Sequence, residues 1–551
     1  MPELNTNDLF PYKPAGKYSK RVAYFSMEFA IDQALKIYSG GLGFLAGSHL
    51  RSAYELKQNL FGIGILWSYG YYDQVRDHDG KMTPNFTRKR YSFLTDLGLI
   101  FPVTVHGAEV KVKAFLIKPE VFGTVPLFLL TTDIDENDGL SRSITRKLYD
   151  DNEATRVAQS IVLGIGGAKL IDLLKLNVDF YHMNEGHSLP LNFYLLEKFG
   201  SIDEVRKRVV FTTHTPEAAG NEERAISLLS DMTFFNHLTA EEAKGLLGIE
   251  SDRLNYTLAA LKFAKRANAV SKLHGVVANE MWSGNEGICE INSITNAQNK
   301  EYWQDKELYD AVEDNNFDSF KSIKKKFKKE LFEIVADQTG KIFDENVITI
   351  VWARRFAGYK RARLIMRNFE NFLKLVNNKK YPVQIIWAGK PYPKDNQAIG
   401  IFNDIFEKTL ELPNCTILTG YELKLSALLK KASDVWLNNP VVTREASGTS
   451  GMTAAMNGAI NLSTPDGWIP EFARHGENCF LIEPASTCDD AIQRDDIENH
   501  NLLHILNTEV LPVYYHQPDK WWEIVKTSTK EVCPAFESGR MADEYYKKLF
   551  V

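Results

Sequence analysis

The sequence of 551 residues has few cysteines, and their arrangement excludes two kinds of architecture. The five cysteines are widely spaced and form no CxxC pair and no Cys/His cluster; they are Cys289, Cys415, Cys479, Cys488 and Cys533. A disulfide framework and a zinc site both need closely grouped ligands, so neither is expected, and no metal is assigned. Buried thiols in a reducing compartment are the simplest interpretation.

Long hydrophobic runs and an excess of basic residues are also absent. No stretch of about eighteen apolar residues occurs, and the amino terminus, MPELNTNDLFPYK, lacks the basic and apolar segments of a secretory signal. The 65 Lys and Arg residues face 71 Asp and Glu residues, which gives a net charge of -6. We therefore expect a cytoplasmic protein whose partners include neither nucleic acid nor a membrane.

The size and composition are those of a large globular enzyme. Hydrophobic residues make up 44% and charged residues 25% of a chain that is too long for one hydrophobic core. Two large domains with a cleft between them are expected.

Short apolar runs in the second half alternate with segments of helical periodicity. The expected strands are residues 347–352, 383–389, 415–420, 434–439 and 459–463, and the expected helices include residues 360–378 and 423–432. Such alternation predicts a doubly wound parallel sheet. The strongest charge run, KSIKKKFKKE at residues 321–330, is interpreted as the solvated face of a helix.

The first half contains similar runs with longer insertions. Strands are expected at residues 21–29, 178–186 and 209–216, and the alternating segment 103–117 predicts an antiparallel insertion. We expect an N-terminal Rossmann-like domain over residues 1–292, a C-terminal Rossmann-like domain over 293–520, and a helical segment over 521–551 that packs back on the first domain.

Two segments next to predicted strands could bind phosphate. In YSGGLGFLAGSHL, Gly40, Gly41 and Gly43 can free backbone N–H groups at a helix start, although a tight turn without a ligand fits equally well. In VWARRFAGYKRAR, Arg355 and Lys360 follow a strand and can reach one anion. A solvated basic helix start is the alternative, but cations there oppose the helix dipole.

Three further segments carry groups suited to a sugar. Glu445 can accept hydrogen bonds from hydroxyls, and the loop that follows, with Ser447, Gly448 and Thr449, offers N–H groups; a glycine-rich turn is the alternative. The first-half strands end in HMNEGH and THTP, which hold Asn184, Glu185 and His187, and then His214. Either histidine could be structural, yet two polar strand ends favour a binding cleft.

Together, YSGGLG, NEGH, THTP, ARRFAGYKRA, DVWLNNP and EASGTSGM resemble the motifs of short-form bacterial α-glucan (glycogen) phosphorylases, in the same order from about residue 20 to 470. The resemblance implies a GT-B architecture and retaining glucosyl transfer on α-1,4-glucans or maltooligosaccharides. It implies that Arg355 and Lys360 bind the substrate phosphate beside Gly40 and Gly41. It further implies glucosyl contacts from His214, Glu445, Ser447, Gly448 and Thr449, a domain-joining role for Asn296, and a cofactor pocket lined by Tyr421.

The sequence departs from the family at the cofactor. In the family the pattern EASGTSGMK ends in a lysine that holds pyridoxal phosphate as a Schiff base, whereas this chain has Thr453 at that position. A threonine has no amine, and its neighbours Ala454, Ala455 and Met456 supply none. Smaller departures are Ser48 for the usual aspartate and TNAQN at residues 295–299 for TNGVH.

Three functions are compatible with this departure. A nucleotide-sugar donor would carry its own second phosphate to the Arg355 and Lys360 side chains. An α-glucan phosphorylase would use glucose 1-phosphate and phosphate with a cofactor held without a covalent bond, or with free phosphate in its place. A noncatalytic glucan-binding relative would use the cleft for recognition alone. A glycosidase with Glu185 and Asp466 as paired carboxylates is less favoured, and a homodimer fits each reading.

Overall fold

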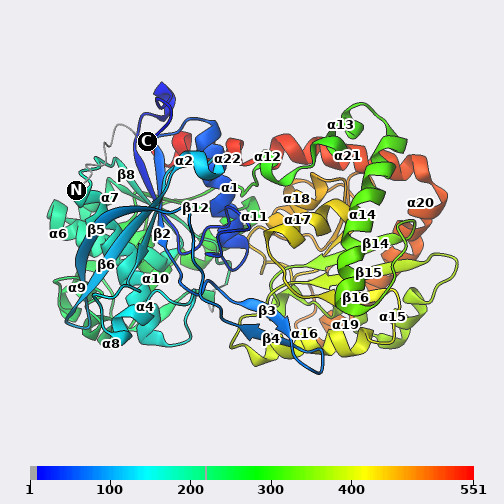
Figure 1. Ribbon diagram of the computed structural model, residues 1–551, viewed down its shortest axis with the longest axis horizontal. Helices are drawn as coiled ribbons and strands as arrows, with labels where there is room; N and C mark the ends of the chain where they lie inside the picture. The colour runs from blue at the N-terminus through cyan, green and yellow to red at the C-terminus, as the bar shows by residue number, and fades with distance from the viewer. Residues whose placement is uncertain (1–8, 218–219) are drawn as a thin grey trace. The chain divides into compact units, whose positions relative to one another are not determined.

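The computed structural model describes residues 9–217 and 220–551. Within these residues the chain forms two compact α/β units, each with its own largely parallel sheet and flanking helices (Figure 1). Unit 1 comprises the chain up to Tyr72, Phe86–Asn296 and Ser538–Val551, and unit 2 comprises Asp73–Asn85 and Ala297–Glu537. The predicted fold class, α/β with two doubly wound units, is confirmed.

Unit 1 is built on a nine-stranded sheet. In spatial order the strands are β13 (Ile291–Ser293), β12 (Arg266–Ala269), β9 (Val209–Thr212), β8 (Phe180–Asn184), β1 (Val22–Phe25), β2 (Leu60–Ile65), β7 (Leu127–Thr131), β6 (Ala108–Ile117) and β5 (Thr95–Val105). Neighbours from β13 to β7 pair in parallel, whereas β7, β6 and β5 pair antiparallel. The antiparallel insertion predicted from the alternating segment is therefore confirmed.

Helices cover this sheet, and a separate two-stranded antiparallel sheet is formed by β10 (Glu223–Ala225) and β11 (Arg253–Asn255). The helices are α1 (Gly41–Glu55), α2 (Pro119–Phe122), α3 (Gly139–Ser143), α4 (Glu153–Ile161), α5 (Gly167–Leu173), α6 (Pro190–Phe199), α7 (Ile202–Arg206), α8 (Ile226–Asp231), α9 (Ala240–Leu247), α10 (Tyr256–Phe263), α11 (Lys272–Trp282) and α22 (Ser538–Lys548).

The C-terminal helix α22 packs on α1. The Ser538 and Ser52 hydroxyl oxygens lie 2.6 Å apart, and Gln58 Nε2 donates to the Ala542 carbonyl at 3.0 Å. The Tyr545 ring meets the buried His49 ring edge-on, with 5.2 Å between centroids. These contacts make the last residues of the chain part of the core of unit 1.

Unit 2 contains a six-stranded parallel sheet. Its strands in spatial order are β16 (Cys415–Leu418), β15 (Val383–Ala388), β14 (Ile348–Ala353), β17 (Val435–Asn438), β18 (Ile460–Ser463) and β19 (Phe480–Leu481). Every residue of the first five is buried, as expected for parallel strands covered on both faces. These five strands lie within the ranges predicted from the apolar runs, to within one residue at their ends.

The helices of unit 2 and one hairpin complete the unit, and α14 crosses in front of the strands in Figure 1. The helices are α12 (Lys300–Trp303), α13 (Lys306–Glu313), α14 (Phe317–Thr339), α15 (Phe369–Val376), α16 (Asn396–Thr409), α17 (Leu423–Ala432), α18 (Thr449–Ala455), α19 (Ala491–Ile505), α20 (Leu511–His516) and α21 (Pro518–Phe536). The hairpin of β3 (Asp73–Arg76) and β4 (Met82–Asn85) also belongs to this unit. Its Arg76 side chain stacks on the Phe406 ring and donates to the Ile417 carbonyl at 2.6 Å.

The helix predicted over residues 360–378 is wrong in its first half. The segment forms a 3-10 turn at Gly358–Lys360, another at Leu364–Met366, and a helix only from Phe369. Arg361 adopts a left-handed backbone with φ of 51°, which interrupts the helix. Its guanidinium compensates by donating to the carbonyls of Asn439 and Pro440.

The charge run 321–330 does lie on a helix, α14, but the prediction of a solvated face is wrong for two of its lysines. Lys324 and Lys328 are 5% and 2% exposed. Lys324 Nζ donates to the carbonyls of Lys431, Ser433 and Asn457 at 2.6–3.1 Å, and Lys328 Nζ lies 2.6 Å from Asp434 Oδ2. Both amines tie α14 to the sheet side of unit 2.

The five cysteines are free thiols, of which Cys415, Cys479 and Cys533 are buried and Cys289 and Cys488 are half-buried. The prediction of buried thiols is therefore confirmed for three of the five cysteines. In the part of the chain that the structure describes, no helix is both long enough and apolar enough to span a membrane.

Replacing Lys324 by methionine should lower the free energy of unfolding by about 3 kcal/mol, because three buried carbonyls lose their amine donor. Urea unfolding of the variant measures the loss. Lys321→Met on the same helix is the matched control, since the Lys321 side chain is 52% exposed and its removal should cost less than about 0.5 kcal/mol. Equal effects of the two substitutions would contradict a structural role for the Lys324 amine.

Candidate active site

The carboxyl end of β14 in unit 2 carries a cluster of three charged side chains. Lys360 Nζ lies 2.7 Å from Glu445 Oε2, and Arg354 Nη1 lies 3.4 Å from the same oxygen. The three side chains are only 5–12% exposed. The sequence predicted that Lys360 and Glu445 serve one site, and the structure brings them into direct contact.

The cluster holds more positive than negative charge. Burial raises the pKa of Glu445, but Lys360 and Arg354 outweigh it, and the pKa of Glu445 lies below its usual value. Burial lowers the pKa of Lys360 to about 8 against the attraction of Glu445. At neutral pH Lys360 and Glu445 are therefore both ionised.

Arg355 contributes a further positive charge at the same sheet edge. Its side chain is exposed, and its charge is among those that lower the pKa of Glu445. An accessible guanidinium beside a buried cationic cluster is suited to binding a phosphate group.

Asp466 orients the backbone that carries Glu445. Its Oδ2 accepts from the Glu445 N–H at 2.9 Å, and its Oδ1 accepts from the Gly467 N–H at 2.8 Å. Burial raises the pKa of Asp466 to about 6. Sequence reasoning considered Asp466 only as a glycosidase partner of Glu185, which belongs to the other unit, and missed this orienting role.

The small residues after Glu445 pack tightly at the start of α18. Gly448 has φ of 84°, and a Cβ there would lie 3.3 Å from Glu445 Cγ. Ser447 is buried, and its hydroxyl has no hydrogen-bond partner among the described residues. Thr449 begins α18, and a Cβ on Gly451 would lie 2.5 Å from Asn461 Oδ1. The glycines therefore serve close packing.

Thr453 lies on the buried helix α18 and is 1% exposed. Its Oγ1 donates to the Ser450 carbonyl at 3.0 Å. Residues on both sides of it belong to a hydrophobic cluster that contains Met452, Ala455, Met456, Trp468, Ile469, Phe472, Val532, Cys533 and Phe536. The side chain offers no amine, so the position does not fit a covalently held pyridoxal phosphate.

Two more side chains of unit 2 follow neighbouring strands. Tyr421, after β16, hydrogen-bonds through its hydroxyl to the Ala353 carbonyl at 3.4 Å and receives a bond from Ser426 Oγ at 3.2 Å. Lys390, after β15, lies 3.2 Å from Glu422 Oε1, and both side chains are at most 15% exposed. The sequence singled out Tyr421 but missed the Lys390–Glu422 pair, which only the strand order places at this edge.

In unit 1, the glycine-rich turn before α1 is held by the buried carboxylate of Glu28. Its Oε2 accepts from the N–H groups of Ser39 and Gly40, and its Oε1 accepts from the Tyr149 hydroxyl at 2.7 Å. A Cβ on Gly43 would lie 2.7 Å from Glu28 Oε2, whereas a Cβ on Gly41 would meet nothing within 4 Å. Gly43 is therefore a packing glycine, whereas Gly41 has open space at its Cα.

The ends of β8 and β9 form one hydrogen-bonded group, as their parallel pairing predicts. His214 Nε2 bonds to Asn184 Oδ1 at 2.7 Å, and Asn184 Nδ2 donates to Ser26 Oγ at 3.1 Å. Glu185 accepts from the His214 N–H and from Thr215 Oγ1. Because an amide oxygen only accepts, the imidazole proton lies on Nε2.

Glu185 and the neighbouring histidines have displaced pKa values. Burial raises the pKa of Glu185 to about 7, and the residue has a φ of 71°, which is uncommon for a side chain other than glycine. Burial lowers the pKa of His214 to about 3 and that of His187 to about 4. Both imidazoles are therefore neutral at pH 7 and suited to hydrogen bonding rather than to proton transfer.

Asn296 is the last residue of unit 1 before the chain enters unit 2. It is buried, its N–H donates to the Val270 carbonyl at 2.9 Å, and its Oδ1 has no partner among the described residues. The described residues contain no group of three or more His, Cys, Asp or Glu side chains placed to hold a metal ion.

His214→Gln should reduce the dependence of stability on pH. The unfolded chain takes up a proton on His214 near pH 6.5, whereas the folded chain takes it up only near pH 3, so stability falls as the pH drops below 6.5. Between pH 5 and pH 7 the free energy of unfolding should rise by about 2 kcal/mol more in the wild type than in the variant. Urea titrations at both pH values test this, and equal gains would show that folding does not lower the pKa of His214.

The chain is similar to known proteins over most of its length. A family model described as carbohydrate phosphorylase matches residues 257–490. The chain is 33% identical to maltodextrin phosphorylase of Thermococcus litoralis over 97% of this chain and 71% of that protein, and 30% identical to glycogen phosphorylase of Aquifex aeolicus over 97% and 86%. It is also 48% identical to an uncharacterised protein of Methanocaldococcus jannaschii over 96% and 100% of the two chains. This chain therefore belongs to the carbohydrate phosphorylase family.

Proposed function

We propose that the protein transfers α-glucosyl units between a phosphate-bearing donor and an α-1,4-glucan, without an imine-bound cofactor. As a member of its family the chain is a glycosyltransferase-type enzyme. The observation that carries the proposal is that unit 2 keeps Arg354, Lys360 and Glu445 as one charged cluster, while the nearby helix α18 has Thr453 in place of the family's lysine.

The other buried lysines of unit 2 are already engaged. Lys324 and Lys328 bond to backbone carbonyls, and Lys328 also pairs with Asp434. Lys390 pairs with Glu422, and Lys430 lies over the Trp303 ring at 3.7 Å from its centroid. These contacts favour structural roles for the four amines and make a substitute Schiff-base lysine among them unfavourable.

In the proposed reaction Lys360 and Arg355 bind the donor phosphate. The Glu445 carboxylate accepts hydrogen bonds from hydroxyls of the glucosyl unit, and the Ser447 hydroxyl exchanges hydrogen bonds with them. The leaving phosphate takes the acceptor proton on the face from which it departs, so the configuration is retained. The cations stabilise the negative charge that develops on that phosphate.

Two donors fit this scheme, and a different observation favours each. A nucleoside diphosphate glucose brings a second phosphate of its own, which would meet the surplus of cations at Arg354, Arg355 and Lys360 in a protein with no amine at Thr453. Glucose 1-phosphate is favoured by the similarity to proteins named maltodextrin and glycogen phosphorylase. With that donor, pyridoxal phosphate or free phosphate would be held without a covalent bond.

Chain extension of a maltooligosaccharide tests the proposal and separates the donors. The purified protein is incubated with ADP-glucose, UDP-glucose, or glucose 1-phosphate with and without pyridoxal phosphate, and the products are separated by length. Extension from a nucleotide sugar alone identifies a synthase, and extension from glucose 1-phosphate identifies a phosphorylase. No extension from any donor would overturn the proposed transfer.

Arg355→Ala is the control in the same assay, because it removes an exposed phosphate ligand without touching the core. Its transfer rate should fall by at least about 100-fold, in keeping with the loss of one charge-assisted contact to the departing phosphate. An undiminished rate with an unchanged melting temperature would remove Arg355 from the donor site.

Thr453→Lys should restore covalent capture of pyridoxal phosphate. After incubation with the cofactor and reduction with borohydride, the variant should gain the mass of one reduced cofactor on the α18 peptide, and the wild type should gain none there. Thr453→Met is the matched control, because it adds a long side chain without an amine. Capture by the wild type at another lysine would show that a different amine replaces the missing one.

A further inference from the structure

The hairpin of β3 and β4 carries a buried amide side chain, Gln74, which the reaction proposed above does not use. Gln74 is 8% exposed, and it bonds to the backbone that follows two strands of the unit 2 sheet. Its Nε2 donates to the Gly389 carbonyl at 2.8 Å, directly after β15, and its Oε1 accepts from the Tyr421 N–H at 3.1 Å, after β16. A carbonyl only accepts and an N–H only donates, so a single orientation of the amide makes both bonds. Gln74 therefore joins the carboxyl ends of β15 and β16.

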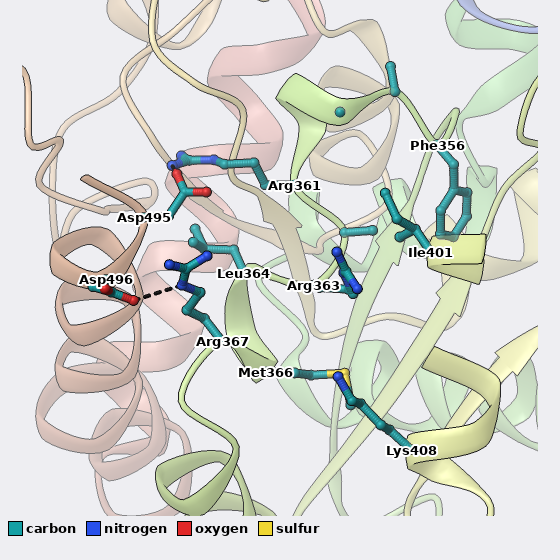
Figure 2. A pocket seen from close by; sticks show the side chains of 13 residues that line it. Phe356, Arg361, Arg363, Leu364, Met366, Arg367, Ile401, Lys408, Asp495 and Asp496 are labelled. Atoms are coloured by element: carbon teal, nitrogen blue, oxygen red, sulfur yellow. Dashed lines mark hydrogen bonds and ion pairs between the residues drawn. The ribbon is translucent and has the colours of Figure 1, made fainter. Parts of the chain in front are cut away.

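Gly389 is the point at which the end of β15 meets the charged cluster. It has φ of 146°, and a Cβ there would lie 1.8 Å from the Arg354 carbonyl oxygen. The same Cβ would lie 3.1 Å from the Phe356 ring, which Figure 2 shows on the side of a pocket that Ile401 of α16 also lines. The segment that begins at Arg354 therefore packs directly on the residue that Gln74 bonds.

Tyr421, the second residue that Gln74 bonds, also contacts the end of β14. Its hydroxyl donates to the Ala353 carbonyl at 3.4 Å, and the residue after it, Glu422, pairs with Lys390. Lys390 in turn directly follows Gly389 in the chain. A single residue therefore separates Gln74 from the backbone at the end of β14, whether the contacts are followed through β15 or through β16.

The hairpin that carries Gln74 is fixed to α16 by contacts of its own. The Met82 N–H donates to Asn403 Oδ1 at 2.9 Å, and Lys81 Nζ lies 2.8 Å from Glu407 Oε1. Figure 1 shows the two strands beside α16, in keeping with these contacts. A substitution of Gln74 should therefore leave the hairpin in place and change only what the amide holds.

We propose that Gln74 is a positioning residue for the donor-binding cluster, an inference that rests on the proposed function. Its amide fixes the ends of β15 and β16 to each other, and these ends hold the backbone from which the Arg354 side chain extends. Arg354 is one of the two buried cations next to Glu445. Cations that are held in place before the donor arrives need not be ordered on binding, so a fixed backbone favours stabilisation of the departing phosphate.

Hydrogen exchange followed by mass spectrometry tests this role without turnover, so its outcome is independent of the proposed transfer. The variant is Gln74→Met, which keeps the length of the side chain and removes both hydrogen bonds. Exchange should become at least about tenfold faster over residues 419–423, which contain the Tyr421 N–H, and over residues 352–356, which contain Arg354.

Gln384→Met is the matched control, because Gln384 makes a similar pair of backbone bonds at the amino end of β15. It is 4% exposed, its Oε1 accepts from the Asp344 N–H at 2.6 Å, and its Nε2 donates to the Asp344 carbonyl at 3.0 Å. Both variants should lower the melting temperature, but this control should leave exchange over residues 352–356 and 419–423 unchanged. Equal acceleration in both variants, or none in Gln74→Met, would overturn the proposal.

The transfer assay gives a second readout with whichever donor supports chain extension. The kcat/KM for that donor should fall about tenfold in Gln74→Met and by less than about twofold in Gln384→Met. Equal losses would indicate a purely structural role and overturn the proposal. Absence of extension by the wild type would overturn the proposed transfer, and the exchange result would then decide the role of Gln74 alone.

Gln74→Glu adds a pH-dependent rescue that a purely structural role would not produce. A protonated carboxyl group can donate to the Gly389 carbonyl and accept from the Tyr421 N–H, as the amide does, whereas a carboxylate only accepts. Relative to the wild type at the same pH, kcat/KM of this variant should therefore rise as the pH falls. A ratio as low as that of Gln74→Met at every pH would overturn the proposal.

Discussion

The charged cluster of Arg354, Lys360 and Glu445 is the constraint on which the active edge of unit 2 depends. Removing ions from water costs several kcal/mol each, and such a group is stable only when its partners are held in place. Here Asp466 fixes the backbone of Glu445, and Arg361 fixes the segment that carries Lys360. The cluster has one more positive than negative charge, and this net positive charge, which attracts anions, is present in the folded protein without a ligand.

Membership of the carbohydrate phosphorylase family accounts for this cluster but not for Thr453. Gly448, at the end of the loop after Glu445, lies close to Trp468, and Gly451 in the following helix α18 lies close to Asn461 and Trp468. Thr453 lies in that same helix. The loop proposed to hold a glucosyl unit and the position of the family's cofactor lysine are thus neighbours in the chain. One can change without disturbing the other, because the packing of α18 depends on its glycines and apolar residues rather than on residue 453.

Much of this organisation could be predicted from the sequence. Buried parallel strands read as apolar runs, which is why β14 to β18 were located correctly. Polar residues after two of these strands made Lys360 and Glu445 candidate site residues, whereas Tyr421 was suggested only by the family resemblance. The contacts made by Glu28, Asp466 and Lys390 were not predicted, because each acts on residues distant in the chain. The inward lysines of α14 were also missed, since a run of like charges does not reveal which members find buried carbonyls.

The course of the chain has a consequence for protein synthesis. The backbone passes between the units four times, after Tyr72, Asn85, Asn296 and Glu537, and the residues from Ser538 onward complete unit 1. Until they leave the ribosome, His49 and the neighbouring face of α1 lack the cover that Tyr545 and Ser538 provide. Unit 1 therefore remains incompletely packed while unit 2 is translated. During that time the uncovered face of α1 is exposed to aggregation and proteolysis.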